Sequence, residues 1–413
     1  MRRGIHHNWM YTVVPYAAIG SGLSVIIPLY ILSLNGTVFD VGVAITAYYL
    51  VSIPSSLIWG RLTDRLARHK MFILLSFLGT LPVIFILYLL GHIAFLQFDY
   101  GLYALVATAA SPAINILVMG TKRNPSLPKY FSRYSTLSIL GGMLAFAAGL
   151  FVSYDTIIYY IDFLLLLNVI ALAMAYFWVI EMPKKTLTRD EIRTAHSAFP
   201  ILNMLSTLPH LMTGMPLITK IHKSLRKKRT RRIYTLLSAI ALFNLGSMMF
   251  NTSYIPYLRV HGLTYGSVFL INVLNSVGQF LIYAIVLFFV TQAVDLRRYY
   301  RLATITRSAS YLIAIVPLFV LAGIFFELNI VLYFIAGLAY AYWNISSSVM
   351  VYDHVRGRHK GYYIGVWTSI IGFSAVVGSF ASGAISAGLG YVYTFALAIA
   401  LTVASVLVLR KCY

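Results

Sequence analysis

The sequence has few charged residues and a single cysteine. Only 10% of its 413 residues are Asp, Glu, Lys or Arg, and 60% are hydrophobic, whereas soluble domains carry about 25% charged and 45–50% apolar residues. A soluble fold of this length could not bury enough surface to accommodate a mean hydropathy of +0.82. The lone Cys412 has no partner for an intrachain disulfide. The composition therefore excludes a soluble enzyme, a disordered chain and a disulfide-stabilised scaffold.

Long apolar runs indicate membrane-spanning helices. A span needs about 20 mostly apolar residues, and twelve such segments are predicted, six on each side of a central stretch. The predicted spans cover residues 10–33, 41–60, 71–92, 100–120, 134–153, 157–179, 233–254, 265–290, 303–326, 331–351, 362–386 and 389–409. The sequence thus predicts an all-α integral membrane protein, with a six-helix bundle at 1–180, a linker at 181–232 and a second six-helix bundle at 233–413.

The basic residues test this count. With the N-terminus in the cytoplasm, 31 of the 32 Lys and Arg fall in cytoplasmic segments, and only Arg259 falls outside. Positive charge in cytoplasmic loops is the normal topology signal of membrane proteins. We therefore expect a multi-pass plasma-membrane protein with both termini in the cytoplasm. The net charge of +21 is then explained by topology and by attraction to anionic lipid, with no nucleic-acid partner.

The central stretch contains one segment of uncertain structure. Residues 198–219 are fairly apolar, contain three prolines and precede a dense cluster of Lys and Arg. A thirteenth span here would move that cluster outside and invert every later loop. Short helices on the cytoplasmic leaflet and a solvated basic linker are the two interpretations left open.

The two halves carry signs of duplication. Five residues recur at offsets between 228 and 231, and six helices per repeat preserve the orientation of each repeat, so the repeats are parallel. The pairs are Pro28 with Pro256, Asp64 with Asp295, Asn115 with Asn344, Gly142 with Gly372, and Gly149 with Gly378. Two bundles related by an axis along the membrane normal are expected.

A charged motif follows the second predicted span. Residues 60–70 place Asp64 among cations, with Gly60 and Leu62 before it and Arg65 and Arg68 after it. In a twelve-helix, duplicated chain, this motif resembles the loop signature of the major facilitator superfamily, whose pattern is Gly-x-Leu-Ala-Asp-Arg-x-Gly-Arg-Lys.

Three positions depart from the family pattern, and the second repeat retains only Asp295. The departures are Thr63, Ala67 and His69. The resemblance implies that this loop latches helices 2 and 11 while the substrate cavity faces outward. Asp64 is then the latch acid, Arg65 and Arg68 are its partners, and Gly60 belongs to the same motif.

The resemblance also implies a substrate cavity lined by helices 1, 4, 7 and 10. Polar residues at helical spacing inside a span usually face protein or water, and helices 7 and 10 carry such stripes. Packing between helices is the alternative role for each residue. The cavity candidates are Tyr16, Asn115, Asn244, Asn251, Tyr254, Tyr340, Trp343 and Asn344.

Charge is expected to be nearly absent within the spans. Of the eleven acids, only Asp162 falls inside a predicted span, and Arg307 lies near the inner end of the ninth, where it could snorkel to the interface. We therefore expect a small neutral or amphipathic substrate. Transport would be facilitated diffusion or use an unusual coupling route, with Asp162 as the possible coupling acid.

The leading functional interpretation is a monomeric secondary transporter that works by alternating access on a small-molecule substrate. A membrane-embedded enzyme is the main alternative, for which Asp353 and His354 form the nearest approach to a reactive pair. A receptor or lipid scramblase on the same fold is a third. The sequence contains no Walker A motif and no metal-spaced Cys/His set, so a primary pump is not expected, and neither is a cofactor or a metal.

Overall fold

The computed structural model describes residues 7–66, 68–88, 91–120, 127–179, 181, 228–289, 296–315, 324–354 and 360–410. Every regular element in these ranges is a helix, as expected where lipid provides no hydrogen-bond partner for an open backbone. The N-terminal bundle comprises η1 (His7–Thr12), α1 (Val13–Ser33), α2 (Val38–Leu66), α3 (His69–Ile86), α4 (Ile93–Ala107), α5 (Ala110–Gly120), α6 (Leu127–Ala148), η2 (Gly149–Phe151) and α7 (Ile157–Trp178). The C-terminal bundle comprises α12 (Lys228–Val260), α13 (Tyr265–Phe289), α14 (Leu296–Ile315), α16 (Phe325–His354), α17 (Lys360–Gly388) and α18 (Tyr391–Arg410).

The helices confirm the predicted architecture of two six-helix bundles. Within the described ranges, eleven helices are long and apolar enough to cross a membrane. The predicted ninth span corresponds to α14, which is described only as far as Ile315. Pro28 lies inside α1 and Pro256 inside α12, near the same end of the first helix of each bundle. The two prolines therefore occupy corresponding places in the two repeats.

Some predicted boundaries differ from those in the structure. Helix α2 continues to Leu66, so Gly60, Asp64 and Arg65 lie on its last turns and not in a loop. Cations on the last turn of a helix interact favourably with the helix dipole. The fourth span begins at Ile93, seven residues earlier than predicted, and breaks between α4 and α5. Residues 198–219, for which short surface helices were an open interpretation, lie outside the described residues.

Two ends of the molecule are distinguished below. The linker end is where α7 finishes and α12 begins, and the far end carries the turns after α1, η2, α12 and α17. The basic residues Arg65, Arg68, Lys70 and Arg410 lie at the linker end of their helices. Arg259 lies at the far end, next to the close of α12.

At the far end the two bundles touch through glycine. A Cβ atom on Gly42 of α2 would lie 2.8 Å from Cα of Gly383 of α17 and 3.1 Å from the Ser379 carbonyl oxygen. The Thr46 and Ser379 hydroxyls are 2.9 Å apart, in hydrogen-bond contact across the same seam. Small residues let helix backbones approach closely, which favours association in lipid. We call this contact between α2 and α17 the glycine seam.

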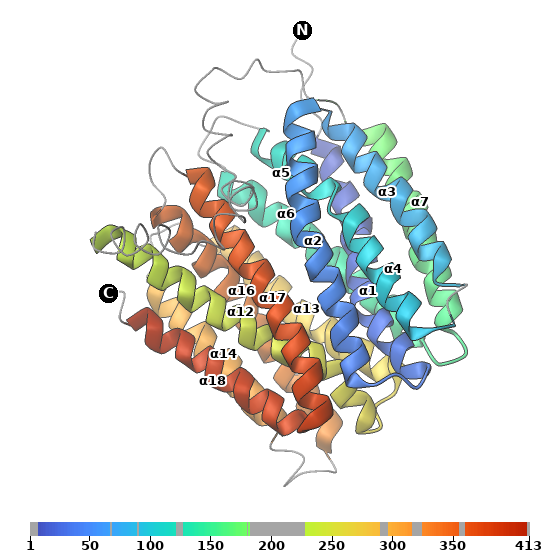
Figure 1. The fold of residues 1–413 in the computed structure, drawn as a ribbon. Helices are drawn as coiled ribbons and strands as arrows, with labels where there is room; N and C mark the ends of the chain where they lie inside the picture. Colours follow the sequence, from blue (N-terminus) through green and yellow to red (C-terminus); the bar gives the residue numbers. More distant parts are fainter. Residues whose placement is uncertain are drawn as a thin grey trace, which may run out of the picture.

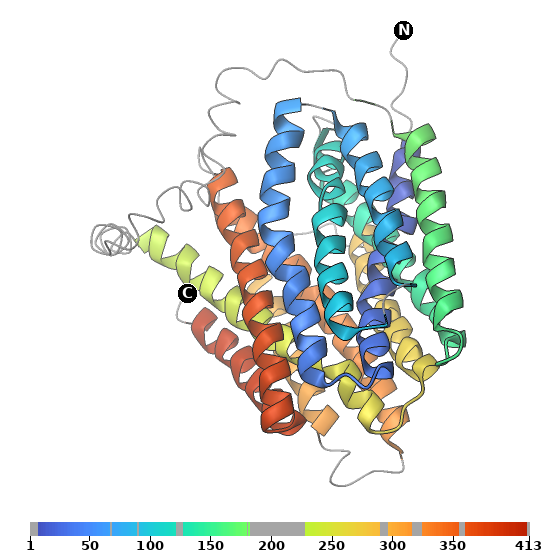
Figure 2. The ribbon, with the colours of Figure 1, turned by 45° about the vertical axis from the view of Figure 1, so that its right-hand side comes forward.

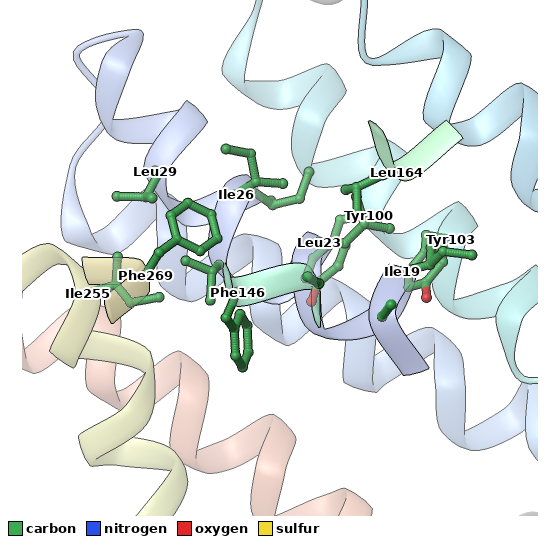
Figure 3. Close-up of a cluster of buried hydrophobic side chains, with 14 of the residues drawn as sticks. Ile19, Leu23, Ile26, Leu29, Tyr100, Tyr103, Phe146, Leu164, Ile255 and Phe269 are labelled. Atoms are coloured by element: carbon green, nitrogen blue, oxygen red, sulfur yellow. The ribbon is translucent and has the colours of Figure 1, made fainter. Parts of the chain in front are cut away.

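A second contact joins α13 to the N-terminal bundle at the same end. Phe269 of α13 lies beside Leu29 and Phe146 in the buried cluster, and Ile255 of α12 is next to it (Figure 3). The ring of Phe269 is 5.1 Å from that of Tyr160 of α7, centroid to centroid. Buried apolar side chains therefore connect the far ends of both bundles.

The linker ends are arranged differently. Helices α2 and α17 lie side by side near the far end and separate towards the linker end (Figures 1 and 2). They are still in contact near their middles, where a Cβ atom on Gly372 would lie 2.7 Å from Cγ1 of Ile53. The two helices are therefore closest from the far end to their middles and diverge only beyond that point.

The first prediction concerns the glycine seam. Gly42→Leu places a side chain where the α17 backbone lies, so the far ends cannot stay in contact and should move apart. The distance between spin labels at Tyr154 and Val260, both exposed at the far end of opposite bundles, should increase. Gly388→Leu is the matched control, because a Cβ on Gly388 meets no atom within 4 Å. An unchanged distance in Gly42→Leu would show that the seam does not hold the far ends together.

Candidate functional site

An arginine lies in the middle of the C-terminal bundle. Arg307 of α14 is only 3% exposed. Its Nε donates to the Tyr311 hydroxyl at 2.7 Å, Nη1 donates to the Ala336 carbonyl at 2.6 Å, and Nη2 donates to Oδ1 of Asn251 at 3.3 Å. The guanidinium group thus connects α14 to α12 and α16.

Tyrosine rings flank this guanidinium group. Its carbon is 5.4 Å from the ring centroids of both Tyr311 and Tyr340, within the range of a cation–π interaction. Phe250 of α12 stacks on Tyr311 with centroids 4.0 Å apart, and the Tyr311 hydroxyl donates to Ser247 at 3.1 Å. These contacts fix the aromatic side chains that surround the charge.

The depth of Arg307 corrects the sequence-based expectation. Its partner Asn251 is nine residues from the far end of α12, which is about 14 Å at 1.5 Å per residue. A hydrocarbon core is about 30 Å thick, so the guanidinium lies near its middle and does not snorkel to an interface. The expectation that Arg307 snorkels to the interface was wrong, because Asn251 and Ala336 on neighbouring helices provide partners for the charge.

Several predicted cavity residues lie around this centre. Asn251 and Tyr340 contact the guanidinium group, and both are half-buried. Trp343 is 6.0 Å from the Tyr340 ring and stacks on Phe243 at 4.0 Å, centroid to centroid. The polar stripes predicted on the seventh and tenth spans, which are α12 and α16, thus converge near Arg307.

Two further candidates are held by bonds between helices. The Tyr254 hydroxyl donates to Oδ1 of Asn329 at 2.9 Å, and the Tyr254 ring stacks on Tyr333 at a centroid distance of 4.5 Å. Nδ2 of Asn344 donates to the Tyr283 hydroxyl at 2.6 Å. Both bonds link α16 to another helix of the same bundle.

The structure places the remaining cavity candidates elsewhere. The Tyr16 hydroxyl donates to the Ala107 carbonyl at 3.0 Å, where α4 ends. Asn244 is buried and donates to the Ile240 carbonyl of its own helix at 3.0 Å. These bonds match the packing role that was the alternative for each residue. The side chain of Asn115 lies outside the described part of the structure.

A buried acid in the N-terminal bundle was missed. Asp99 lies within α4, is 2% exposed, and its Oδ1 has no hydrogen-bond partner. The predicted fourth span began at residue 100, one residue after Asp99, whereas α4 begins at Ile93. Asp162, in contrast, is exposed on α7 and accepts a hydrogen bond from the Tyr88 hydroxyl. Asp162 is therefore not the only acid within a span.

The expected latch residues lie at the linker end of α2. Arg65 and Arg68 are exposed there, while the side chain of Asp64 and all of Asp295 fall outside the described part of the structure. The start of α3 is tied to the N-terminal bundle, because Nδ1 of His69 is 3.5 Å from Oε1 of Glu181 and the Lys70 amide donates to Oε2 at 3.1 Å. In the parts of the chain that the structure describes, no group of three His, Cys, Asp or Glu side chains could hold a metal ion.

Solved membrane transporters share this fold. A variant of the nucleoside transporter NupG superposes with a TM-score of 0.72 at 11% identity, covering 98% of each chain. A variant of the peptide transporter POT gives a TM-score of 0.72 at 14% identity over 98% of this chain and 93% of the other. A POT family transporter in complex with 5-aminolevulinic acid gives 0.67 at 15% identity, over 98% and 94%. No curated protein sequence matches the chain.

Two packed six-helix bundles with a polar centre between membrane helices define a secondary transporter. The family model described as Major Facilitator Superfamily matches residues 11–324. The chain belongs to the major facilitator superfamily, as the motif around Asp64 predicted. At these identities the solved structures establish the fold alone, and they leave the substrate unspecified.

The second prediction concerns Asp99. A buried carboxylate oxygen without a hydrogen-bond partner, such as Oδ1 of Asp99, destabilises a fold, since it loses its hydration and gains no compensating bond. Asp99→Asn keeps the shape and removes the charge, so the thermal unfolding midpoint of the purified protein at pH 8 should rise. Asp155→Asn is the control, because Asp155 is exposed and its substitution should leave the midpoint unchanged. A lower midpoint in Asp99→Asn would mean that the native carboxylate has a stabilising partner.

Proposed function

We propose that this protein is a plasma-membrane transporter that moves a small organic solute by alternating access. It functions as a monomer in this proposal, with the linker end and both termini in the cytoplasm. The basic residues at the linker end support this orientation. The solute binds where the polar stripes of α12 and α16 converge, opposite α1 and α2 of the other bundle.

The observation that carries the proposal is the asymmetry between the two ends. Gly42 and Gly383 meet at the far end, while α2 and α17 separate towards the linker end. In the proposed orientation we interpret this asymmetry as a state that is closed to the outside and gives access from the cytoplasm. Transport then requires a second state in which the seam opens and the linker ends meet.

The motif at the end of α2 supplies the contact that the second state needs. We propose that Asp64, with Gly60, Arg65 and Arg68, closes the linker end against the start of α17 when the far end opens, and that Asp295 is the counterpart of Asp64 in the second repeat. In the present state Arg65 and Arg68 are exposed, which agrees with a latch that is not engaged.

The direct test is uptake into proteoliposomes. The purified protein is reconstituted and offered a mixture of nucleosides, dipeptides, amino acids and organic acids, and the lumenal contents are identified by mass spectrometry. Protein-dependent uptake of at least one solute, saturable and inhibited by an excess of that solute, is expected. Conversion of a solute without its movement would favour the membrane-embedded enzyme.

The third prediction concerns the latch acid. Asp64→Asn keeps the shape but removes the anion, and a charge-assisted hydrogen bond is worth about 1.5–3 kcal/mol. A change of that size alters a two-state conformational ratio by roughly tenfold or more. Uptake should fall at least tenfold while expression stays near that of the wild type.

Asp162→Asn is the matched control for this prediction. Asp162 is exposed on α7 and bonded to Tyr88, so we propose that it lies outside the transport path. Uptake by this variant should equal that of the wild type, with and without an imposed pH gradient. Gradient-driven accumulation that disappears in Asp162→Asn would make Asp162 the coupling acid. Wild-type uptake by Asp64→Asn would show that the motif serves only topology.

The fourth prediction concerns orientation. Cysteine introduced at His210 or Lys228, in a chain whose Cys412 is replaced by serine, should stay unlabelled by an impermeant thiol reagent in intact cells. Cysteine at Val260, which is 67% exposed at the far end, should be labelled under the same conditions. Labelling at positions 210 and 228, with none at 260, would invert the proposed topology.

A further inference from the structure

Arg307 is a buried cation without an anionic partner among the described side chains. The one ion pair described is between His69 and Glu181 at the linker end of the N-terminal bundle, 3.5 Å apart. The partners of Arg307 are a hydroxyl, a backbone carbonyl and a side-chain amide, all of them neutral. Its positive charge is therefore not neutralised within the described part of the bundle.

These neutral partners do not use the full capacity of the guanidinium group. A guanidinium has five N–H donors, and the described hydrogen bonds use three of them. The rings of Tyr311 and Tyr340 offset part of the cost of dehydrating the charge. An unpaired buried charge is nevertheless expensive, and charged side chains inside membrane spans usually mark a substrate or ion pathway.

The charge lies one side chain behind the face that meets the other bundle. Arg307 and Tyr311 are buried, whereas Asn251 and Tyr340 in front of them are half-buried. Helix α12, which carries Asn251, packs against α2 of the other bundle. A solute between the bundles could thus reach the guanidinium by displacing or passing between Asn251 and Tyr340.

We propose that Arg307 binds an anionic oxygen group, a carboxylate or a phosphate, on the transported solute. The planar guanidinium recognises either group through paired N–H donors, and the half-buried ring of Tyr340 contacts the apolar part of the solute. This inference rests on the proposed transport function and specifies its substrate class. It replaces the expectation of a neutral or amphipathic solute, for which Arg307 was expected to snorkel to the interface.

The test measures binding separately from transport. The purified protein is titrated with two matched pairs of probes, 3-phenylpropionate with 3-phenylpropionamide, and phenyl phosphate with phenol, and binding is followed by the shift of the thermal unfolding midpoint. Each pair keeps the aromatic ring and differs in the anion. The first pair tests a carboxylate and the second a phosphate, so the two sources of the anionic group are distinguished.

Three variants complete the design. Arg307→Gln removes the charge, and Arg307→Lys keeps the charge but loses the paired geometry. Arg259→Gln is the matched control, because Arg259 also donates to a backbone carbonyl, that of Leu263, and also lies over a tyrosine, Tyr265, at 4.3 Å. Arg259 lies at the far end of the molecule, away from the proposed site in the middle of the C-terminal bundle.

The wild type should bind at least one anionic probe at least tenfold more tightly than its neutral partner. Arg307→Gln should lose this preference, Arg307→Lys should keep the preference with weaker binding, and Arg259→Gln should match the wild type. If Arg307→Gln does not fold, Arg307→Lys decides, since an affinity unchanged from the wild type overturns the assignment. Equal binding of both members of each pair by the wild type, or no binding of either anion, also overturns it and leaves Arg307 as a cross-link between helices.

The experiments can overturn the transport function and the anion site independently of each other. Anion binding that depends on Arg307, without uptake of any solute into proteoliposomes, would overturn the transport function and keep the anion site. Uptake of neutral solutes that is the same in wild type and Arg307→Lys, without an anion preference, would keep the transport function and overturn the anion site.

Discussion

Close approach of helix backbones at the far end is the constraint on which the arrangement of the two bundles depends. Lipid tails are as apolar as leucine, so helices in a membrane are held together by packing and hydrogen bonds and not by exclusion of water. Gly42 and Gly383 permit that packing between α2 and α17, and Thr46 and Ser379 add a hydrogen bond. Because neither glycine has a side chain that could bridge a gap, a small separation of α2 and α17 breaks this contact. Such a contact suits a seam that opens and closes.

Charged residues are concentrated at the linker end, whereas the closest packing between the bundles is at the far end. At the linker end Arg65, Arg68 and Arg410 are exposed. Among the described residues, the charges inside the membrane helices are isolated, with Arg307 in one bundle and Asp99 in the other. Arg307 is placed by neutral groups on three helices, so its position depends on α12, α14 and α16 remaining together. The C-terminal bundle can therefore move as a unit without losing the geometry around the guanidinium.

The sequence predicted the spans, the two bundles and the family, because long apolar runs and one-sided charge depend only on local composition. It also placed Asn251 and Tyr340 on polar stripes that converge in the structure. It missed Arg307 and Asp99, because an ionisable residue near the predicted end of a span was read as interfacial. Spacing alone could not show that Ala336 and Asn251 would provide partners at that depth, nor that Tyr16 would bond to the break after α4. Those outcomes depend on contacts between residues far apart in the chain.

The central claim is that the two ends of the molecule open in alternation about the glycine seam. Its most direct test is to measure spin-label distances in the wild-type protein in lipid, with one pair at Leu66 and Arg301 at the linker end and another at Tyr154 and Val260 at the far end. The account predicts a short-distance and a long-distance population for each pair. When ligand or pH increases the fraction of long distances at the linker end, the fraction of long distances at the far end should decrease. Distances at both ends that are single-valued, or that lengthen together, would contradict it.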